Sequence, residues 1–223
     1  MHNTESSVYL TTITIQNLYQ IMFDQMGPQG WWPGESKFEI AIGAVLVQNT
    51  NWKNVEYSLD NLRRTTQLQP EKIHALTIEE IQTLIRPSGF FKNKSRCITA
   101  LFEWLAQAHF DWKILSLQST AKLRAQLLKL PGIGPETADS ILLYCLDKPV
   151  FIADSYTRRI FNHLGSAQFS NYAELKTIAE QELNLTLSEF QEFHGLLDDF
   201  GKTNLKNWSS SFLAPYQLVL PKY

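Results

Sequence analysis

Residues 130–159, LPGIGPETADSILLYCLDKPVFIADSYTRR, form the most informative stretch of this 223-residue chain. Gly132 and Gly134 stand one residue apart in a short segment between two stretches of helical periodicity. Glycine permits backbone angles closed to other residues and leaves no side chain to hold a partner away. Pro135 suits the first position of the second helix, where the N–H that it lacks would have no partner. The pattern predicts two helices joined by a tight, bare turn.

The backbone N–H groups of such a turn point outward at the start of a helix, a geometry that binds anions such as phosphate. A phosphate contact positions a nucleic acid but reads no base. An ordinary helix–helix turn is the alternative, and the two glycines alone would favour it. LPGIG followed by P-x-T-A and an apolar helix favours the phosphate site, with Ile133 anchoring the turn in the core.

Composition and charge limit the classes of protein that the chain can be. Hydrophobic residues make up 44% of it, enough for a sizeable core in one domain or two small ones. The net charge of −2 gives no global basic signature, so a surface for nucleic acid would have to be local. No apolar stretch is long enough to span a bilayer and no leader pattern opens the chain. We expect a cytoplasmic protein without a membrane partner.

Two cysteines, Cys97 and Cys145, lie in apolar segments that look helical. Two distant thiols make neither a metal-ligand cluster nor a disulfide framework, so we expect buried thiols in a reducing compartment. The five histidines are scattered and show no HExxH pattern, which argues against a zinc enzyme. We therefore expect no metal held by side chains.

Helical periodicity dominates the sequence and convincing strand alternation is absent, which predicts an all-α protein. Residues 36–39 (SKFE) and 77–80 (TIEE) are typical of capping boxes, and Ser119 or Thr120 suits the start of a further helix. Two more helices are expected near 173–183 and 188–200. We expect Gly201 to form the left-handed end of the second.

LPGIGPETADSILLY followed by FIADSYTRRIFNHLG resembles the helix-hairpin-helix DNA glycosylases of the endonuclease III superfamily, and the resemblance extends over residues 31–202. It implies a two-lobed all-α fold with the active site in the cleft between the lobes. A helical-barrel lobe would span 30–146, and residues 1–29 with 147–223 would form the second lobe. It further implies that Gly132, Ile133 and Gly134 bind the backbone of damaged double-stranded DNA, and we expect a monomer.

By the resemblance, Asp154 is the catalytic aspartate. Breaking an N-glycosidic bond builds positive charge on the sugar. A carboxylate stabilises that charge and can orient or deprotonate the attacking water. The alternative is that Asp154 only caps the helix that follows it. Both roles are compatible, because a capping position also presents its carboxylate at the edge of a domain.

One departure from the family's lyases concerns the nucleophile. In those enzymes a lysine two residues after the second hairpin glycine attacks the sugar and forms a Schiff base. That position is Glu136 here, 18 residues before Asp154, and a glutamate cannot form a Schiff base. We therefore expect water as the nucleophile and little AP lyase activity, unless a lysine from elsewhere, such as Lys202, takes the role.

A second departure concerns cofactors. Many relatives hold an iron–sulfur cluster with four C-terminal cysteines, but no cysteine follows Cys145 in this chain. That cluster cannot form without its thiolate ligands, so we expect no cofactor. The resemblance leaves open a monovalent cation on the backbone carbonyls of the hairpin.

The tryptophan-rich segments GWWPG and QNTNW resemble those of the 3-methyladenine glycosylase subgroup, where aromatic and proline side chains sandwich the extruded base. An aromatic face also attracts the positive charge of an alkylated purine. The resemblance assigns Trp31, Pro33 and Trp52 to the base pocket, with Trp32 either in the pocket or supporting it. Lys202 matches a lysine near the pocket in that subgroup, although a surface lysine at the end of a helix is equally ordinary. The alternative is that the tryptophans are core residues, and Trp52 does lie on the apolar stripe of its helix.

Three further side chains are candidates for contact with DNA. Gln48 matches a family glutamine that inserts into the duplex, although a helix-end glutamine bonded to backbone is the alternative. Lys92 and Lys94 lie where a family loop touches the DNA backbone, although solvated surface charges are equally ordinary. If they do bind DNA, its affinity should fall steeply as salt rises.

Taken together, these residues predict a monofunctional DNA glycosylase of base excision repair. It would hydrolyse the N-glycosidic bond of alkylated purines such as 3-methyladenine. One alternative is an endonuclease III-like glycosylase for another damaged or mispaired base. The other is a helix-hairpin-helix module that binds DNA without catalysis.

Overall fold

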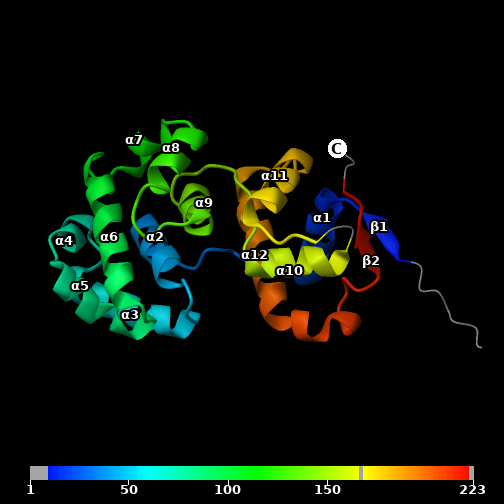
Figure 1. Ribbon diagram of the computed structural model, residues 1–223, viewed down its shortest axis with the longest axis horizontal. Helices are drawn as coiled ribbons and strands as arrows, with labels where there is room; N and C mark the ends of the chain where they lie inside the picture. Colours follow the sequence, from blue (N-terminus) through cyan, green and yellow to red (C-terminus); the bar gives the residue numbers. More distant parts are fainter. Residues whose placement is uncertain (1–9, 166–167, 221–223) are drawn as a thin grey trace, which may run out of the picture. The chain divides into compact units, whose positions relative to one another are not determined.

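The computed structural model describes residues 10–165 and 168–220. The chain packs as two compact units (Figure 1). Unit 1 contains the residues up to Trp31 and those from Phe151 onward, and unit 2 is Trp32–Val150. The sequence had placed these boundaries after residues 29 and 146. The cleft expected between the two units stays a prediction.

Unit 2 is built from helices around a central, buried one. Helix α2 (Lys37–Leu46) is buried from Ala41 to Leu46 and packs against α3, α6 and α9. A helix that is apolar on nearly every face is stable only in the centre of a domain. The other elements of the unit are α3 (Trp52–Thr66), α4 (Pro70–His74), α5 (Ile78–Leu84), η1 (Arg86–Ser88), α6 (Phe91–Ala106), α7 (Trp112–Ser116), α8 (Thr120–Leu127) and α9 (Pro135–Tyr144).

Unit 1 is organised around its longest helix, α12 (Leu187–Thr203), which packs against α1, α10 and η2. Its buried stripe includes the fully enclosed rings of Phe193 and Phe200. The other elements are β1 (Thr11–Ile13), α1 (Ile15–Met26), α10 (Ser155–Leu164), α11 (Tyr172–Glu182), η2 (Leu205–Ser210) and β2 (Tyr216–Leu218).

Strands β1 and β2 pair in parallel, with Thr11 opposite Tyr216 and Ile13 opposite Leu218. The sequence analysis expected no strands. Each strand has three residues, too few for alternation between apolar and polar side chains to stand out. The protein is otherwise helical in its described residues. No helix among them combines the length and hydrophobicity that crossing a membrane would require.

The expected helix starts are confirmed at three positions: Ser36, Thr77 and Ser119 each accept a backbone N–H of the helix that they cap. The box at Thr77 is complete, whereas only half of the box forms at Ser36. The Glu39 carboxylate accepts the backbone N–H of Glu35 at 3.0 Å in place of that of Ser36, and its other oxygen pairs with the Arg63 guanidinium at 2.6 Å.

Gly201 does not end its helix, which corrects the sequence-based prediction. Helix α12 continues to Thr203, and the backbone at Gly201 is not left-handed. The glycine is needed for a different reason: a Cβ at this position would lie 2.5 Å from the Cβ of Tyr156. The bare helix surface gives α10 a place to approach closely.

Candidate active site

The hairpin of residues 130–135 joins α8 to α9, and its two glycines are there for different reasons. Gly132 has a φ of 82°, and a Cβ on it would lie 3.2 Å from the Cβ of Cys97. The fold itself therefore requires glycine there. Gly134 is extended, with a φ of −89°, and no atom lies within 4 Å of the position that a Cβ would take. The space outside Gly134 is open to an approaching molecule.

The rest of the hairpin fits the sequence-based prediction. Ile133 is buried, with 5% of its surface exposed, which confirms its role as an anchor. Pro135 begins α9 behind the N-cap Gly134, and no side chain caps this helix start. An ion pair that was not predicted from the sequence joins the two hairpin helices. The Arg124 guanidinium of α8 donates two hydrogen bonds to the fully buried Asp139 carboxylate of α9, with N–O distances of 2.8 Å and 3.1 Å.

Gln48 lies just beyond the end of α2 and contacts the hairpin. Its Nε2 donates to the backbone oxygen of Gly132 at 3.2 Å and to Oγ1 of Thr137 at 2.9 Å. The alternative of a helix-end glutamine bonded to backbone therefore describes this residue as it stands in the structure. Its insertion into a duplex, and a cation on the hairpin carbonyls, both stay predictions.

Lys92 and Lys94 differ in how far they are buried. Lys92 is exposed on α6, and its contact with DNA stays a prediction. Lys94 is 3% exposed, and its ammonium donates to the backbone oxygens of Leu46 at 2.8 Å and Ser88 at 2.7 Å. Burial lowers the pKa of Lys94 to about 8. The prediction that Lys94 binds the DNA backbone is wrong, because its charge is used inside the unit.

Phe90 is a candidate that the sequence analysis missed. It is the N-cap residue of α6, has a left-handed φ of 46°, and is 65% exposed. It lines a hollow of about 110 Å³ together with Gln48, Asn49 and Gly132. A large aromatic side chain is therefore exposed beside the hairpin. The signal in the sequence was a phenylalanine directly after Gly89, where a helix begins.

Asp154 is the N-cap of α10 in unit 1. Its Oδ1 accepts the backbone N–H of Thr157 at 2.7 Å, so the capping role is confirmed. The residue is 8% exposed. Burial raises the pKa of the Asp154 carboxyl, and the bond from Thr157 and the charges of Arg158 and Lys202 offset part of that rise. The carboxylate is fixed in direction and poorly hydrated, which suits a group that must stabilise positive charge.

His194 is the neighbour of Asp154 that sequence reasoning did not identify. Its Nε2 lies 4.0 Å from Oδ2 of Asp154. Burial lowers the pKa of His194 to about 4, so the imidazole is neutral at pH 7. His194, Asp198 and Lys202 are spaced by four residues and share one face of α12. That spacing, within EFHGLLDDFGK, was the available signal.

Trp31 packs against the same helix. The Lys202 ammonium lies 5.0 Å from the centre of the Trp31 ring, and it also pairs with the Asp198 carboxylate. Burial raises the pKa of Asp198, while the hydrogen bond and charge of Lys202 lower it. The structure therefore brings Asp154, Trp31 and Lys202 close to one another within unit 1. That they share a base pocket stays a prediction.

The other predicted pocket residues belong to unit 2. The Trp32 ring meets the rings of Trp52 and Tyr144 edge-on, at centroid distances of 5.8 Å and 5.5 Å. Both tryptophans lie over Gly43 of α2, within 4 Å of the place that a Cβ there would occupy. Trp32 is half-buried, and its role in the pocket stays a prediction. Pro33 and Trp52 also line an open hollow of about 420 Å³.

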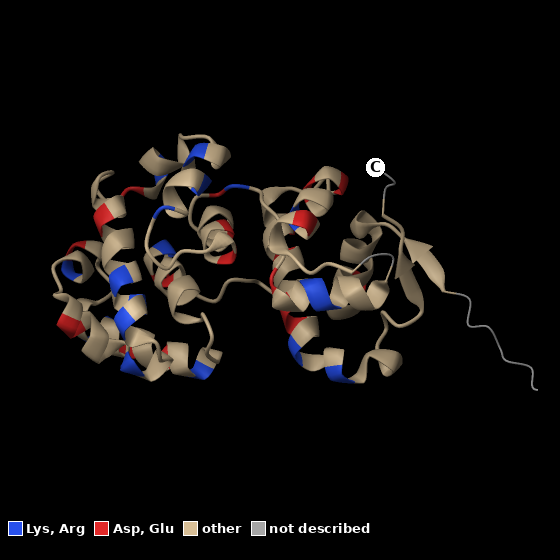
Figure 2. Cartoon of the chain, viewed as in Figure 1, with Lys and Arg blue, Asp and Glu red and all other residues tan. Residues whose placement is uncertain are grey.

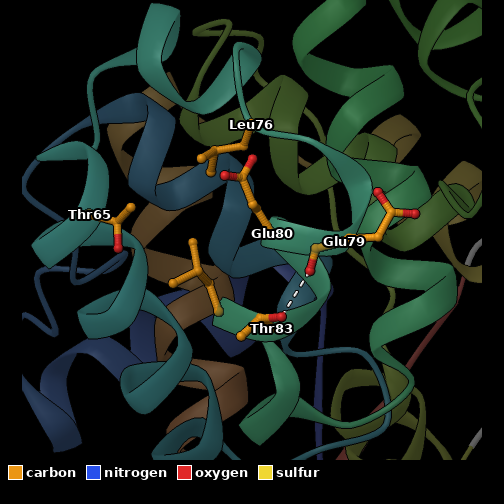
Figure 3. A pocket seen from close by; sticks show the side chains of 6 residues that line it. Thr65, Leu76, Glu79, Glu80 and Thr83 are labelled. Carbon is orange, nitrogen blue, oxygen red and sulfur yellow. Dashed lines mark hydrogen bonds between the residues drawn. The ribbon is translucent and has the colours of Figure 1, made fainter.

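Two features of unit 2 lie outside the predicted site. A hollow on α3 and α5 contains none of the predicted residues (Figure 3); it is lined by Thr65, Leu76, Glu79, Glu80, Thr83 and Leu84. Cys97 and Cys145 are free and buried, as predicted, and burial raises the pKa of Cys97 to about 12. In residues 10–165 and 168–220, no group of three His, Cys, Asp or Glu could hold a metal ion.

Charges of both signs are interspersed along the helices of each unit (Figure 2), in keeping with the net charge of −2. The hairpin N–H groups and a few exposed cations such as Lys92 are therefore the local features available to an anion. A phosphate backbone would be held mainly by main-chain donors at the bare turn.

Comparison with known proteins bears on what these features do. Residues 42–184 match the family model described as HhH-GPD superfamily base excision DNA repair protein. A protein of Methanocaldococcus jannaschii with the provisional name DNA repair glycosylase is 38% identical over 82% of this chain and 84% of its own length. Endonuclease III of Thermotoga maritima is 28% identical over 74% of this chain and 73% of its own length.

Two solved structures share the architecture. H. pylori 3-methyladenine DNA glycosylase (MagIII), bound to 1,N6-ethenoadenine, matches with a TM-score of 0.75 at 27% identity, over 85% of this chain and 98% of that one. A non-covalent endonuclease III–DNA complex matches with a TM-score of 0.71 over 89% and 91%. At 21% identity, the second match is a likeness of fold alone.

Proposed function

Because the chain belongs to the HhH-GPD superfamily of base excision DNA repair proteins, and so is a DNA glycosylase, we propose that it releases alkylated purines such as 3-methyladenine. The observation that carries this proposal is Asp154, a buried carboxylate held in one direction at the start of α10. The likeness to a 3-methyladenine glycosylase structure at 27% identity supports the substrate class.

The hairpin would bind the backbone of double-stranded DNA. The open space at Gly134 and the uncapped start of α9 leave main-chain N–H groups for a phosphate oxygen. Lys92, exposed on α6, would add a contact that depends on salt. Such contacts hold the duplex in register and leave the choice of lesion to the base pocket.

The extruded base would then need a place to stack, and its gap in the duplex would need filling. We assign stacking to Trp31, Pro33 and Trp52, with Trp32 as support, since aromatic stacking contributes about 1–3 kcal/mol per base. Gln48 would fill the gap after leaving its bonds to the hairpin. Phe90, exposed beside it, would wedge between bases.

The chemistry needs no acid to protonate the leaving group. Alkylation at N3 or N7 gives the purine a positive charge, so the base leaves as a neutral molecule with the electrons of the N-glycosidic bond. The sugar becomes positively charged, and the Asp154 carboxylate stabilises it. A water molecule adds its oxygen to C1′, and its proton passes to Asp154 and then to solvent.

A hydrolytic reaction also agrees with the two positions from which a lysine nucleophile could come. Glu136 occupies the position of the lyases' lysine and is exposed in the first turn of α9. The alternative lysine, Lys202, has its ammonium bonded to Asp198 and cannot attack while it carries that proton. We therefore propose little AP lyase activity, which borohydride trapping on damaged duplex DNA would test: a covalent complex would refute it.

The test of the activity is release of free base from methylated duplex DNA, resolved by chromatography, beside duplexes that contain thymine glycol or uracil. We expect release of 3-methyladenine without strand cleavage. Asp154→Asn should slow release by about 10²–10⁴-fold while duplex affinity is kept. Release of another base would keep the glycosylase and refute the alkylpurine pocket. Binding without any release would identify a non-catalytic module.

A further inference from the structure

The inference concerns the charge carried by one face of α12. On this face the Asp198 carboxylate accepts a hydrogen bond from the Lys202 ammonium, one helical turn away. The two ends of the pair differ in burial, since the side chain of Asp198 is 12% exposed and that of Lys202 is 44% exposed. Asp198 is therefore the fixed partner, and it determines where the ammonium lies.

The Trp31 ring lies against this pair, with the ammonium 5.0 Å from its centre. Its side chain is held close to α12 because Gly195 leaves the helix bare: a Cβ there would lie 2.7 Å from the Cβ of Trp31. His194 also meets the ring edge-on, at a centroid distance of 6.4 Å. We name Trp31, Lys202 and Asp198 together the Trp31 assembly.

The net charge of the Trp31 assembly bears on which bases can approach it. The electron-rich face of a tryptophan attracts cations, but Lys202 already supplies one. With Asp198 ionised, the ammonium is compensated and the assembly is close to neutral. Without that carboxylate the Lys202 ammonium beside the ring would be an uncompensated positive charge, which repels a second cation. The other charged groups facing this region are Asp154 and Arg158. The charge of Lys202 also lowers the pKa of Asp154, an effect that is common to every base released.

We propose that Asp198 determines specificity, because by neutralising Lys202 it keeps the Trp31 ring open to cationic, alkylated bases. This inference rests on the proposed function, in which Trp31 contacts the extruded base. Asp198 itself acts through Lys202 and is a positioning residue. The bases concerned are N3- and N7-methylated purines, which are cationic in DNA, as opposed to neutral adducts such as 1,N6-ethenoadenine.

The two members of the pair make opposite predictions. Asp198→Asn leaves the ammonium uncompensated and should disfavour cationic bases. Lys202→Gln leaves the carboxylate uncompensated and should favour them. A purely structural role would not behave in this way, because both substitutions weaken the same charge-assisted hydrogen bond and would move all substrates in the same direction.

The experiment measures single-turnover rates of base release from a methylated duplex and from a duplex that contains 1,N6-ethenoadenine. The ratio of the cationic to the neutral rate should fall about tenfold in Asp198→Asn and rise about tenfold in Lys202→Gln, each about 1.4 kcal/mol. The double variant should return towards the wild-type ratio. Asp199→Asn, which removes the same charge one residue along α12, is the matched control and should leave the ratio unchanged.

The outcomes separate this inference from the proposed function. If the wild type releases methylated bases but the two variants shift the ratio in the same direction, or not at all, the role of Asp198 is overturned and the glycosylase stands. If the wild type releases only the cationic base, Asp198→Asn should slow that release and Lys202→Gln should speed it, with circular dichroism confirming that both variants are folded. Changes in the same direction would overturn the role of Asp198. If it binds DNA and releases neither base, both proposals fail.

Discussion

Replacing Lys94 with methionine should destabilise the protein and leave the salt dependence of DNA binding unchanged. The ammonium of Lys94 donates to two buried carbonyl oxygens, those of Leu46 and Ser88. The first belongs to the last residue of α2 and the second to the last residue of η1, so one side chain satisfies the ends of two helices.

The size of the effect follows from those two bonds. A buried carbonyl that loses its donor costs about 1–3 kcal/mol. Methionine keeps most of the apolar stem in place and removes a charge that is costly to bury. We therefore expect a loss of about 2–4 kcal/mol in the free energy of unfolding. For a chain of this size, that corresponds to a fall of about 4–16 °C in Tm.

The assay pairs thermal unfolding with duplex affinity measured across a range of salt concentrations. Lys92→Met is the matched control, because Lys92 lies two residues earlier on α6 and is exposed. It should leave Tm almost unchanged and lower the slope of log affinity against log salt by about one. Lys94→Met should lower Tm and leave the salt slope unchanged. A normal Tm with a reduced salt slope for Lys94→Met would refute the buried role.

Three further predictions concern glycines and pH. Gly134→Ala should change the stability by less than about 1 kcal/mol, because the reduced freedom of the unfolded chain offsets the poorer N-cap residue, yet weaken duplex binding in a filter assay; unchanged binding would contradict the phosphate site. Gly201→Ala should cost about 1–3 kcal/mol of stability in urea unfolding, because its Cβ would lie 2.5 Å from that of Tyr156; a neutral result would refute this reason for the glycine. Base release should fall as pH is lowered and Asp154 takes up a proton. Because burial raises that pKa, the loss should begin at a higher pH than for an exposed aspartate, and a flat acidic limb would contradict it.

What could be predicted from the sequence was mainly local. The hairpin turn, the helix starts at Ser36 and Thr77, and the capping position of Asp154 all depend on residues within a few positions of one another. Residue spacing and residue type predict short-range geometry of this kind directly. The all-α glycosylase fold followed from the same hairpin and aspartate, and the family match confirms it.

What could not be predicted depends on residues far apart in the chain. The burial of Lys94 depends on carbonyls 48 and 6 residues away, and nothing in the basic run around it distinguishes it from Lys92. The reason for Gly201 is the Tyr156 side chain on another helix. The pairing of Trp31 with Lys202 likewise joins two ends of the sequence. Tertiary packing decides such cases, and periodicity does not encode it.

The two hairpin glycines should respond differently to selection for folding and to selection for ligand binding. Gly132 is held by the protein's own interior, so any screen for folded protein would preserve it. A Cβ at Gly134 would have no atom within 4 Å beyond its chain neighbours, so a population selected only for folding should accumulate side chains there at little cost. Only a partner that approaches the turn would remove those variants. The variation tolerated at these two positions would therefore distinguish a residue required for folding from a residue required for ligand binding.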